Sequence, residues 1–211
     1  KMGLEVGFGG SATWTGTVYV DDVQYLGTET GVKWVVADFE NQARGVYDFV
    51  NAGFGPALTG MEWMADPSAQ SAGVLRTVWD FNGKEKGAFS KDPLDLRWTD
   101  DGGVVTQGAT AVTFDVWVPA DMPDGVQFGL WAQDPPTWNW TEYPTILSDA
   151  TFNKGDWTTL VYDVIDSQTN NGFDPFYPMK FGVQLYVAGG AAWAGDIYWD
   201  NLTEIGVNPP E

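Results

Sequence analysis

Segments in which apolar and polar residues alternate run through the chain and restrict it to folds built from β-strands. In residues 109–118, valine and phenylalanine occupy alternate positions. They would line one face of a strand, because successive side chains of a strand point to opposite sides. The same alternation recurs in residues 126–133 and 180–187. A turn signal at residues 121–125 separates two of these segments, and no 3.6-residue periodicity predicts a helix.

About nine such segments follow one another between residues 33 and 205. The apolar share of the chain, 44%, is sufficient for a substantial core. Many short antiparallel strands in one domain predict two sheets packed face to face. We therefore expect an all-β fold, a two-sheet antiparallel β-sandwich of jelly-roll type. The predicted strands are residues 33–39, 61–65, 73–81, 87–91, 109–118, 126–133, 157–163, 180–187 and 195–205.

The C-terminal segment, residues 180–206, has a second copy at the start of the chain. Residues 1–27 align with it without gaps and share roughly nine identities, which is typical of tandem modules. The first copy could rest on its own module, or it could complete the sheet of a neighbouring copy of the chain by strand addition. The expected domains are a C-terminal hairpin of a preceding repeat module at 1–28, a complete β-sandwich module at 29–207 and a linker at 208–211.

The charge of the chain restricts its partners. There are 29 acidic and 10 basic residues, which give a net charge of -19. This charge would repel the phosphates of nucleic acid and the anionic headgroups of a membrane, so we exclude both as partners. It also disfavours acidic polysaccharides, whose binding sites usually supply basic side chains. A neutral ligand is favoured, and the acidic, tryptophan-rich composition is typical of an extracellular protein.

The chain contains neither cysteine nor histidine, and this limits its chemistry. Thiol catalysis and disulfides are excluded, and the usual ligands of zinc are missing. A metal site would have to be built from the oxygen atoms of carboxylates, amides and backbone carbonyls. Such a site suits a hard ion, and Ca²⁺ is abundant where secreted proteins work.

Opposite the apolar positions, the same strands carry amides, carboxylates and aromatic rings. If residues 109–118 and 126–133 pair as a hairpin, their polar sides form one outer sheet face. An aromatic ring can stack on the C–H face of a sugar ring, while amides and carboxylates bind its hydroxyl groups. We therefore interpret this face as a carbohydrate-binding surface. The residues expected on it are Asp115, Trp117, Gln127, Trp131, Gln133, Gln184 and Tyr186.

The segment that follows the second of these strands, residues 133–143, contains three aromatic residues and two prolines. An apolar loop in water requires a reason for its exposure. We interpret Trp138, Trp140 and Tyr143 as a rim that closes over the ligand. Alternatively, Trp138 or Trp140 covers the edge of the core.

Short motifs of a known family occur at both ends of the predicted module. Residues 36–40 read Val-Ala-Asp-Phe-Glu, and residues 195–202 read Gly-Asp-Ile-Tyr-Trp-Asp-Asn-Leu. With these motifs, residues 34–206 resemble carbohydrate-binding modules of the galactose-binding-like jelly-roll type, preceded by the C-terminal strands of a second copy. That family binds neutral plant or algal glycans, along a sheet face or at loop tips. The resemblance implies the same for this chain.

The resemblance also implies a structural Ca²⁺ ion. In that family the opening Glu and the closing Asp often hold calcium together with backbone carbonyls. The matching residues here are Glu40 and Asp200, with Asp38 as a third candidate. Alternatively, these carboxylates accept hydrogen bonds from nearby backbone amides.

Together, these observations predict non-catalytic binding of a neutral polysaccharide, of β-mannan or β-glucan type, within a secreted multimodular protein. Catalysis is disfavoured because the Glu-x-Asp-x-x-Glu strand of jelly-roll glucanases is absent. The predicted face also offers little positive charge to stabilise the enolate of a lyase reaction. The alternative is a structural repeat of an extracellular filament, surface-layer or adhesin protein that assembles through the repeated terminal strands.

Overall fold

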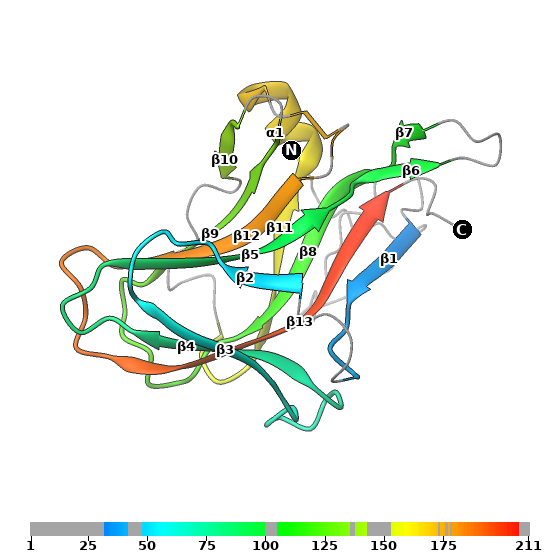
Figure 1. Ribbon diagram of the computed structural model, residues 1–211. Helices are drawn as coiled ribbons and strands as arrows, with labels where there is room; N and C mark the ends of the chain where they lie inside the picture. The colour runs from blue at the N-terminus through cyan, green and yellow to red at the C-terminus, as the bar shows by residue number, and fades with distance from the viewer. Residues whose placement is uncertain are drawn as a thin grey trace, which may run out of the picture.

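The computed structural model describes residues 32–41, 48–99, 105–135, 138–142, 153–172, 174–175, 177 and 179–206. These residues form two antiparallel sheets that pack face to face (Figure 1). The all-β sandwich predicted from the alternating segments is therefore confirmed. The predicted hairpin at residues 1–28 and the linker at residues 208–211 lie outside the described residues.

The first sheet, called the six-stranded sheet below, has the order β11-β8-β13-β4-β3, and β1 pairs with the C-terminal half of β13. The 13-residue strand β13 is central to it, because β13 pairs with β4, β8 and β1 along its length. The strands of this sheet are β1 (Val32–Ala37), β3 (Leu58–Met64), β4 (Val74–Asp80), β8 (Ala109–Trp117), β11 (Trp157–Asp163) and β13 (Ala194–Gly206).

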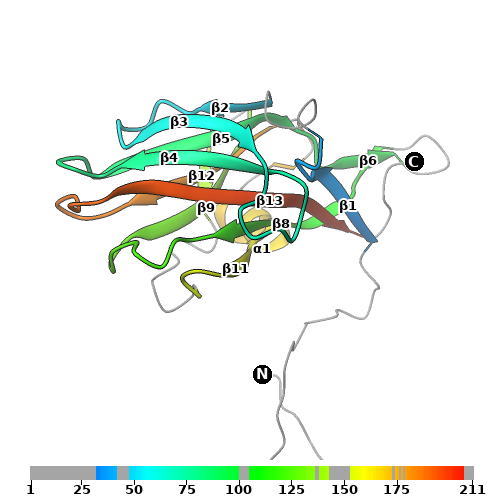
Figure 2. The ribbon, with the colours of Figure 1, turned by 90° about the horizontal axis from the view of Figure 1, so that it is seen from below.

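The second sheet, called the five-stranded sheet, has the order β10-β9-β12-β5-β2. Figure 2 views the molecule from the side of the six-stranded sheet, so that the five-stranded sheet lies behind it. A short pair, β6 (Arg97–Thr99) and β7 (Val105–Gln107), belongs to neither sheet. The strands of the five-stranded sheet are β2 (Phe49–Asn51), β5 (Lys86–Leu94), β9 (Gln127–Gln133), β10 (Trp140–Glu142) and β12 (Met179–Tyr186).

The predicted strands agree well with the observed ones. Every predicted segment overlaps a strand of the structure, and segment 157–163 coincides with β11. The strands that the sequence did not reveal are β2, β6, β7 and β10, each of three residues. A three-residue strand shows only one alternation, so periodicity cannot identify it.

One helix, α1 (Val164–Asn171), contradicts the prediction that the chain contains no helix. Asp163 caps it by accepting a hydrogen bond from the N–H of Asp166, and Gly172 ends it in the left-handed conformation. At eight residues α1 is too short for its periodicity to be distinctive. Across the described ranges of the chain, no helix is long and apolar enough to cross a membrane.

The connection between β8 and β9 also differs from the prediction. Strand β8 pairs with β11 and β13, whereas β9 pairs with β10 and β12 in the other sheet. The turn at residues 121–125 therefore connects the two sheets, and the predicted hairpin between these strands is wrong. Alternation identifies the inward face of each strand, but it does not identify the neighbouring strand.

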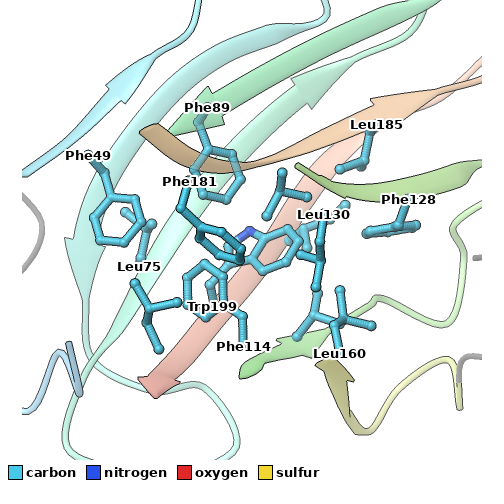
Figure 3. Close-up of a cluster of buried hydrophobic side chains, with 14 of the residues drawn as sticks. Phe49, Leu75, Phe89, Phe114, Phe128, Leu130, Leu160, Phe181, Leu185 and Trp199 are labelled. Atoms are coloured by element: carbon cyan, nitrogen blue, oxygen red, sulfur yellow. The ribbon is translucent and has the colours of Figure 1, made fainter. Parts of the chain in front are cut away.

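The core between the sheets is formed by the side chains that alternation placed inward. On β8, Val112, Phe114 and Val116 are buried, and the corresponding positions of β9 and β12 are buried as well. Trp199 of β13 lies at the centre of this core (Figure 3). Its ring centroid is 5.1 Å from that of Phe89 and 6.2 Å from that of Phe128, which both belong to the five-stranded sheet.

Two tryptophans of the core share one polar partner, Thr77 of β4, which is fully buried. Its hydroxyl oxygen accepts hydrogen bonds from the indole N–H groups of Trp79, at 2.8 Å, and of Trp199, at 2.9 Å. The same hydroxyl donates to the carbonyl of Ile197 at 2.9 Å. One threonine thus satisfies two buried tryptophans, which would otherwise carry unpaired donors.

Replacing Thr77 by valine tests this arrangement, because valine has nearly the same shape and no hydroxyl. We expect Thr77→Val to lower the free energy of unfolding by about 2–4 kcal/mol, since two buried indole N–H groups lose their acceptor. Urea denaturation measures the change. The control is Thr59→Val, because Thr59 is exposed and donates to the carbonyl of Val78. Equal effects of the two substitutions would contradict the importance of Thr77.

Candidate functional site

Three aromatic rings gather on the outer face of the five-stranded sheet. Trp131 of β9 and Trp140 of β10 stack with ring centroids 4.1 Å apart. Phe54, from the segment between β2 and β3, meets both rings edge-on, with its centroid 5.0 Å from Trp140 and 6.0 Å from Trp131. We call these three residues the aromatic cluster. Phe54 is 39% exposed, so the cluster is open to solvent on one side.

Trp131 is the base of the aromatic cluster. It points away from the core, opposite to Phe128 and Leu130, yet its exposed fraction is 0%. Its cross-strand partner on β12 is Gly182, and a Cβ atom at Gly182 would lie 2.7 Å from the indole ring. Glycine therefore leaves the room in which the indole lies against β12. Trp140 stacks on Trp131, so Trp140 and Phe54 provide the ring surface that a ligand can reach.

Next to the aromatic cluster lies Glu142, which is opposite Trp131 in the pairing of β10 with β9. Its Oε1 would lie 3.3 Å from a Cβ atom at Gly129, so a second glycine leaves room for this carboxylate. The amide Nε2 of Gln184 donates to Oε1 at 3.4 Å. Burial raises the pKa of Glu142 above its ordinary value, and a hydrogen bond from the Trp140 side chain offsets part of the rise.

Strand β10 holds Trp140 and Glu142 in place through the residue between them. Thr141 points inward, and its hydroxyl lies 2.7 Å from the Tyr162 hydroxyl of β11. The Tyr162 hydroxyl lies 2.7 Å from that of Ser167 in α1. Burial raises the pKa of Tyr162 to about 12, so this hydroxyl stays protonated and available to the network. The helix that the sequence did not reveal thus supports the edge strand of the site.

Other predicted residues lie on the same face or at its border. Tyr186 of β12 is opposite Gln127 of β9, two register rows beyond Gln184 and therefore on the same face. Gln133 donates from Nε2 to the carbonyl of Trp138 at 3.1 Å, so it holds the loop rather than facing outward freely. Trp138 is 60% exposed. Tyr143 lies outside the described residues.

Neither Trp138 nor Trp140 belongs to the buried core. The alternative that one of them covers the core edge is therefore wrong. Trp140 stacks on Trp131 within the aromatic cluster, and Trp138 is exposed to solvent.

Asp115 and Trp117 lie on the other sheet, because β8 belongs to the six-stranded sheet. Trp117 contacts Tyr198 of β13, with ring centroids 5.3 Å apart. Asp115 accepts hydrogen bonds from the Thr159 hydroxyl at 2.6 Å and from the side-chain amide of Asn201 at 3.1 Å. The prediction that these two residues share one face with Gln127 and Trp131 is wrong, since it depended on the hairpin between β8 and β9.

Sequence reasoning missed Phe54 and Glu142. Glu142 lies two positions after Trp140, so recognising β10 as a strand would have placed both side chains on one face. Phe54 lies in an irregular segment between two strands, and no periodic signal marks it.

A second polar site lies on the six-stranded sheet around Asp200, which is 3% exposed. Burial, together with the nearby negative charges of Glu40 and Asp115, raises the pKa of Asp200 to about 7. Asp200 accepts hydrogen bonds from the backbone N–H of Asn201 at 2.8 Å and from the Ser71 side chain. An ionised carboxylate in this position has charged neighbours of the same sign.

The three residues that the resemblance assigned to calcium lie in this region or beside it. Glu40 accepts a hydrogen bond from the N–H of Ala72 at 2.8 Å, and Asp38 accepts one from the N–H of Glu40 at 3.2 Å. The described residues contain no cluster of three acidic side chains with the geometry of a metal site. The oxygen atoms that the structure does bring to this region belong to the carboxylates of Asp200 and Glu40 and the hydroxyl of Ser71, and oxygen ligands are the kind that a hard cation takes.

Comparisons with known proteins support the fold. Neither a protein-family model nor a curated protein matches the sequence. Among solved structures, a family 28 carbohydrate-binding module specific for non-crystalline cellulose superposes with a TM-score of 0.56 and 14% identity. That match covers 82% of this chain and 94% of the module.

Two further solved structures have a similar fold. A structure from work on promiscuous carbohydrate-binding modules of the β-sandwich superfamily gives a TM-score of 0.53 at 17% identity, with 81% of this chain and 61% of that chain covered. A family 27 module from Caldicellulosiruptor saccharolyticus in complex with mannohexaose gives a TM-score of 0.52 at 20% identity. That match covers 85% of this chain and 98% of the module. The chain thus has the β-sandwich fold of carbohydrate-binding modules, and it spans less than two thirds of the first of these two structures.

The raised pKa of Glu142 predicts an effect on stability. Folding disfavours the ionised form of Glu142. The stability that the protonated carboxyl contributes to the fold is therefore fully present below the pKa of the unfolded chain, and it is lost as the pH rises through the pKa of the folded protein. Glu142→Gln removes this loss. We expect the melting temperature of the variant, relative to the unchanged protein, to be higher at about pH 7.5 than at about pH 4.

Thermal melts at the two pH values measure this difference. The matched control is Glu85→Gln, at an exposed glutamate that accepts a hydrogen bond from the N–H of Gly189. A pH-independent shift in the Glu142→Gln variant would show that the carboxylate is not disfavoured by the fold.

Proposed function

We propose that this chain is a non-catalytic carbohydrate-binding module that binds a neutral polysaccharide through the outer face of the five-stranded sheet. The observation that carries this proposal is the aromatic cluster of Phe54, Trp131 and Trp140 beside the polar pair of Glu142 and Gln184. A sugar ring has apolar C–H faces and a polar rim of hydroxyl groups. The site offers a complementary surface for each.

The groups that remain accessible on this face indicate how a glycan chain would contact it. The ring planes of Trp140 and Phe54 are at 83° to each other, so a sugar ring stacked on one would meet the edge of the other. Gln184 and the opposed pair Gln127 and Tyr186 lie two register rows apart on the same face, and they would contact hydroxyl groups of adjoining sugar units. Trp138 extends this surface at the edge of the sheet.

The type of glycan and the location form part of the proposal. The net charge of -19 favours a neutral ligand. Structures of the same fold include a module solved with mannohexaose and one specific for non-crystalline cellulose, which supports a β-mannan or β-glucan chain as ligand. Because such polymers lie outside cells, we place the protein in the extracellular space, secreted or on a cell surface.

We also propose that Ca²⁺ binds at Asp200 and Glu40, with Asp38 as a further candidate ligand. Bound there, the cation would supply positive charge to a buried carboxylate whose neighbours are acidic. The site lies on the six-stranded sheet, away from the aromatic cluster, so its role would be structural. It would join the end of β1 to the middle of β13.

Removal of one ring tests the binding face. We expect Trp140→Ala to weaken binding by about 2 kcal/mol, or roughly thirtyfold in Kd, as is typical when a central aromatic contact is truncated. A glycan array identifies a ligand, and affinity electrophoresis in gels containing that polysaccharide measures the change.

Two matched tryptophan variants serve as controls. Trp34→Ala removes a tryptophan that is 42% exposed on β1, and Trp117→Ala removes one on the opposite sheet. Both should retain unchanged binding. Undiminished retention of Trp140→Ala, together with weakened retention of Trp117→Ala, would place binding on the six-stranded sheet and reject the proposed face.

Calcium binding is tested by comparing melting temperatures in Ca²⁺ and in chelator. We expect Ca²⁺ to raise the melting temperature, by about 2–4 °C for each kcal/mol of linked binding energy. Asp200→Asn should abolish this increase. In chelator the same variant should melt at or above the temperature of the unchanged protein, because it removes an uncompensated buried carboxylate. Asp124→Asn, at an exposed aspartate, is the control; an equal calcium response in all three proteins would reject the site.

A further inference from the structure

Glu142 lies low on the outer face of the five-stranded sheet rather than projecting from it. Its Oε1 and carboxyl carbon would lie 3.3 and 3.4 Å from a Cβ atom at Gly129, so any larger residue at that position would press on the carboxylate. Trp131 is its cross-strand partner. Thr141, the preceding residue, fixes the strand through the buried Tyr162 hydroxyl. Glu142 is therefore a positioned group and not a mobile surface carboxylate.

The hydrogen bonds of Glu142 leave acceptor capacity unused. A carboxylate offers about four acceptor positions. The Trp140 side chain donates one hydrogen bond, and Gln184 donates a long one of 3.4 Å. None of the salt bridges in the described part of the chain involves Glu142. The remaining capacity can be satisfied by donors on a ligand.

The contact between Gln184 and Glu142 also orients the amide of Gln184. Only the Nε2 end of that amide can donate to a carboxylate, so its Oε1 is left as a second acceptor. Two acceptors side by side match the two O–H groups of a vicinal diol. They do not match an ester, which has no hydrogen to donate and whose carbonyl is itself an acceptor.

We propose that Glu142, with Gln184, makes this site selective for glycans with free vicinal hydroxyl groups and causes it to reject the same glycans when those positions are O-acylated. The inference rests on the proposed function. An acyl group would remove the donor and leave the remaining acceptor positions of the carboxylate desolvated and unfilled. Sites built to bind a hydroxyl strongly reject analogues that lack it. We expect at least a roughly tenfold loss of affinity on acylation.

The test compares polymers that differ only in acylation. The probes are O-acetylated glucomannan and O-acetylated xylan, each alongside its alkali-deacetylated product, and affinity electrophoresis measures binding. The protein should bind a deacetylated polymer at least about tenfold more tightly than its acetylated form. Glu142→Gln should reduce this ratio, because the glutamine N–H can donate to an ester carbonyl, while binding of the deacetylated polymer falls. Trp34→Ala should keep the full ratio, and thermal melts confirm that each variant is folded.

The outcomes separate the inference from the proposed function. Equal binding of acetylated and deacetylated polymers by the unchanged protein would overturn the inference and leave the proposed function standing. A full ratio in the Glu142→Gln variant would show that another group carries the selectivity and would also overturn it. No binding of any of the four polymers would overturn both.

Discussion

The contact of Trp199 with aromatic rings from both sheets holds the sandwich together. Its ring centroid lies 5.2 Å from that of Phe114 in its own sheet and 5.1 Å from that of Phe89 in the other. A buried indole N–H is costly without an acceptor, so a tryptophan at the centre of a core is favoured where one is near. Thr77 supplies that acceptor, and it does the same for Trp79. The contacts of Trp199 with Phe89 and Phe114 therefore help to set the distance and alignment of the two sheets, on which the positions of the outer side chains depend.

The outer face of the five-stranded sheet follows from the same alternation, with glycine at two decisive positions. Gly182 leaves room for the indole of Trp131, and Gly129 leaves room for the carboxylate of Glu142. Side chains that would ordinarily project into solvent thus lie low on the sheet and keep a defined position. Trp140 and Phe54 then rest on Trp131. A rigid arrangement of this kind favours binding, since less side-chain freedom is lost when a ligand arrives.

Much of the fold could be predicted from the sequence, because the core positions of β8, β9 and β12 alternate cleanly. The placement of β8 and β9 in different sheets could not be predicted, since alternation carries no information about which strand is the neighbour. For this reason alternation alone cannot show that Asp115 and Trp117 lie on the six-stranded sheet. The aromatic cluster was predicted only in part. Trp131 and Trp140 stood out as tryptophans, but Phe54 reaches the cluster through tertiary contacts that leave no periodic signal.

We propose that the glycan binds to the outer face of the five-stranded sheet and not to the six-stranded sheet. Nuclear magnetic resonance of the isotope-labelled tryptophan indole N–H groups, followed during titration with mannohexaose and with cellohexaose, tests it most directly. If the glycan binds to the five-stranded sheet, one of these sugars will shift the signals of Trp140 and Trp138, while those of Trp117 and Trp34 stay in place. A shift of the Trp117 signal with no change at Trp140 would contradict it.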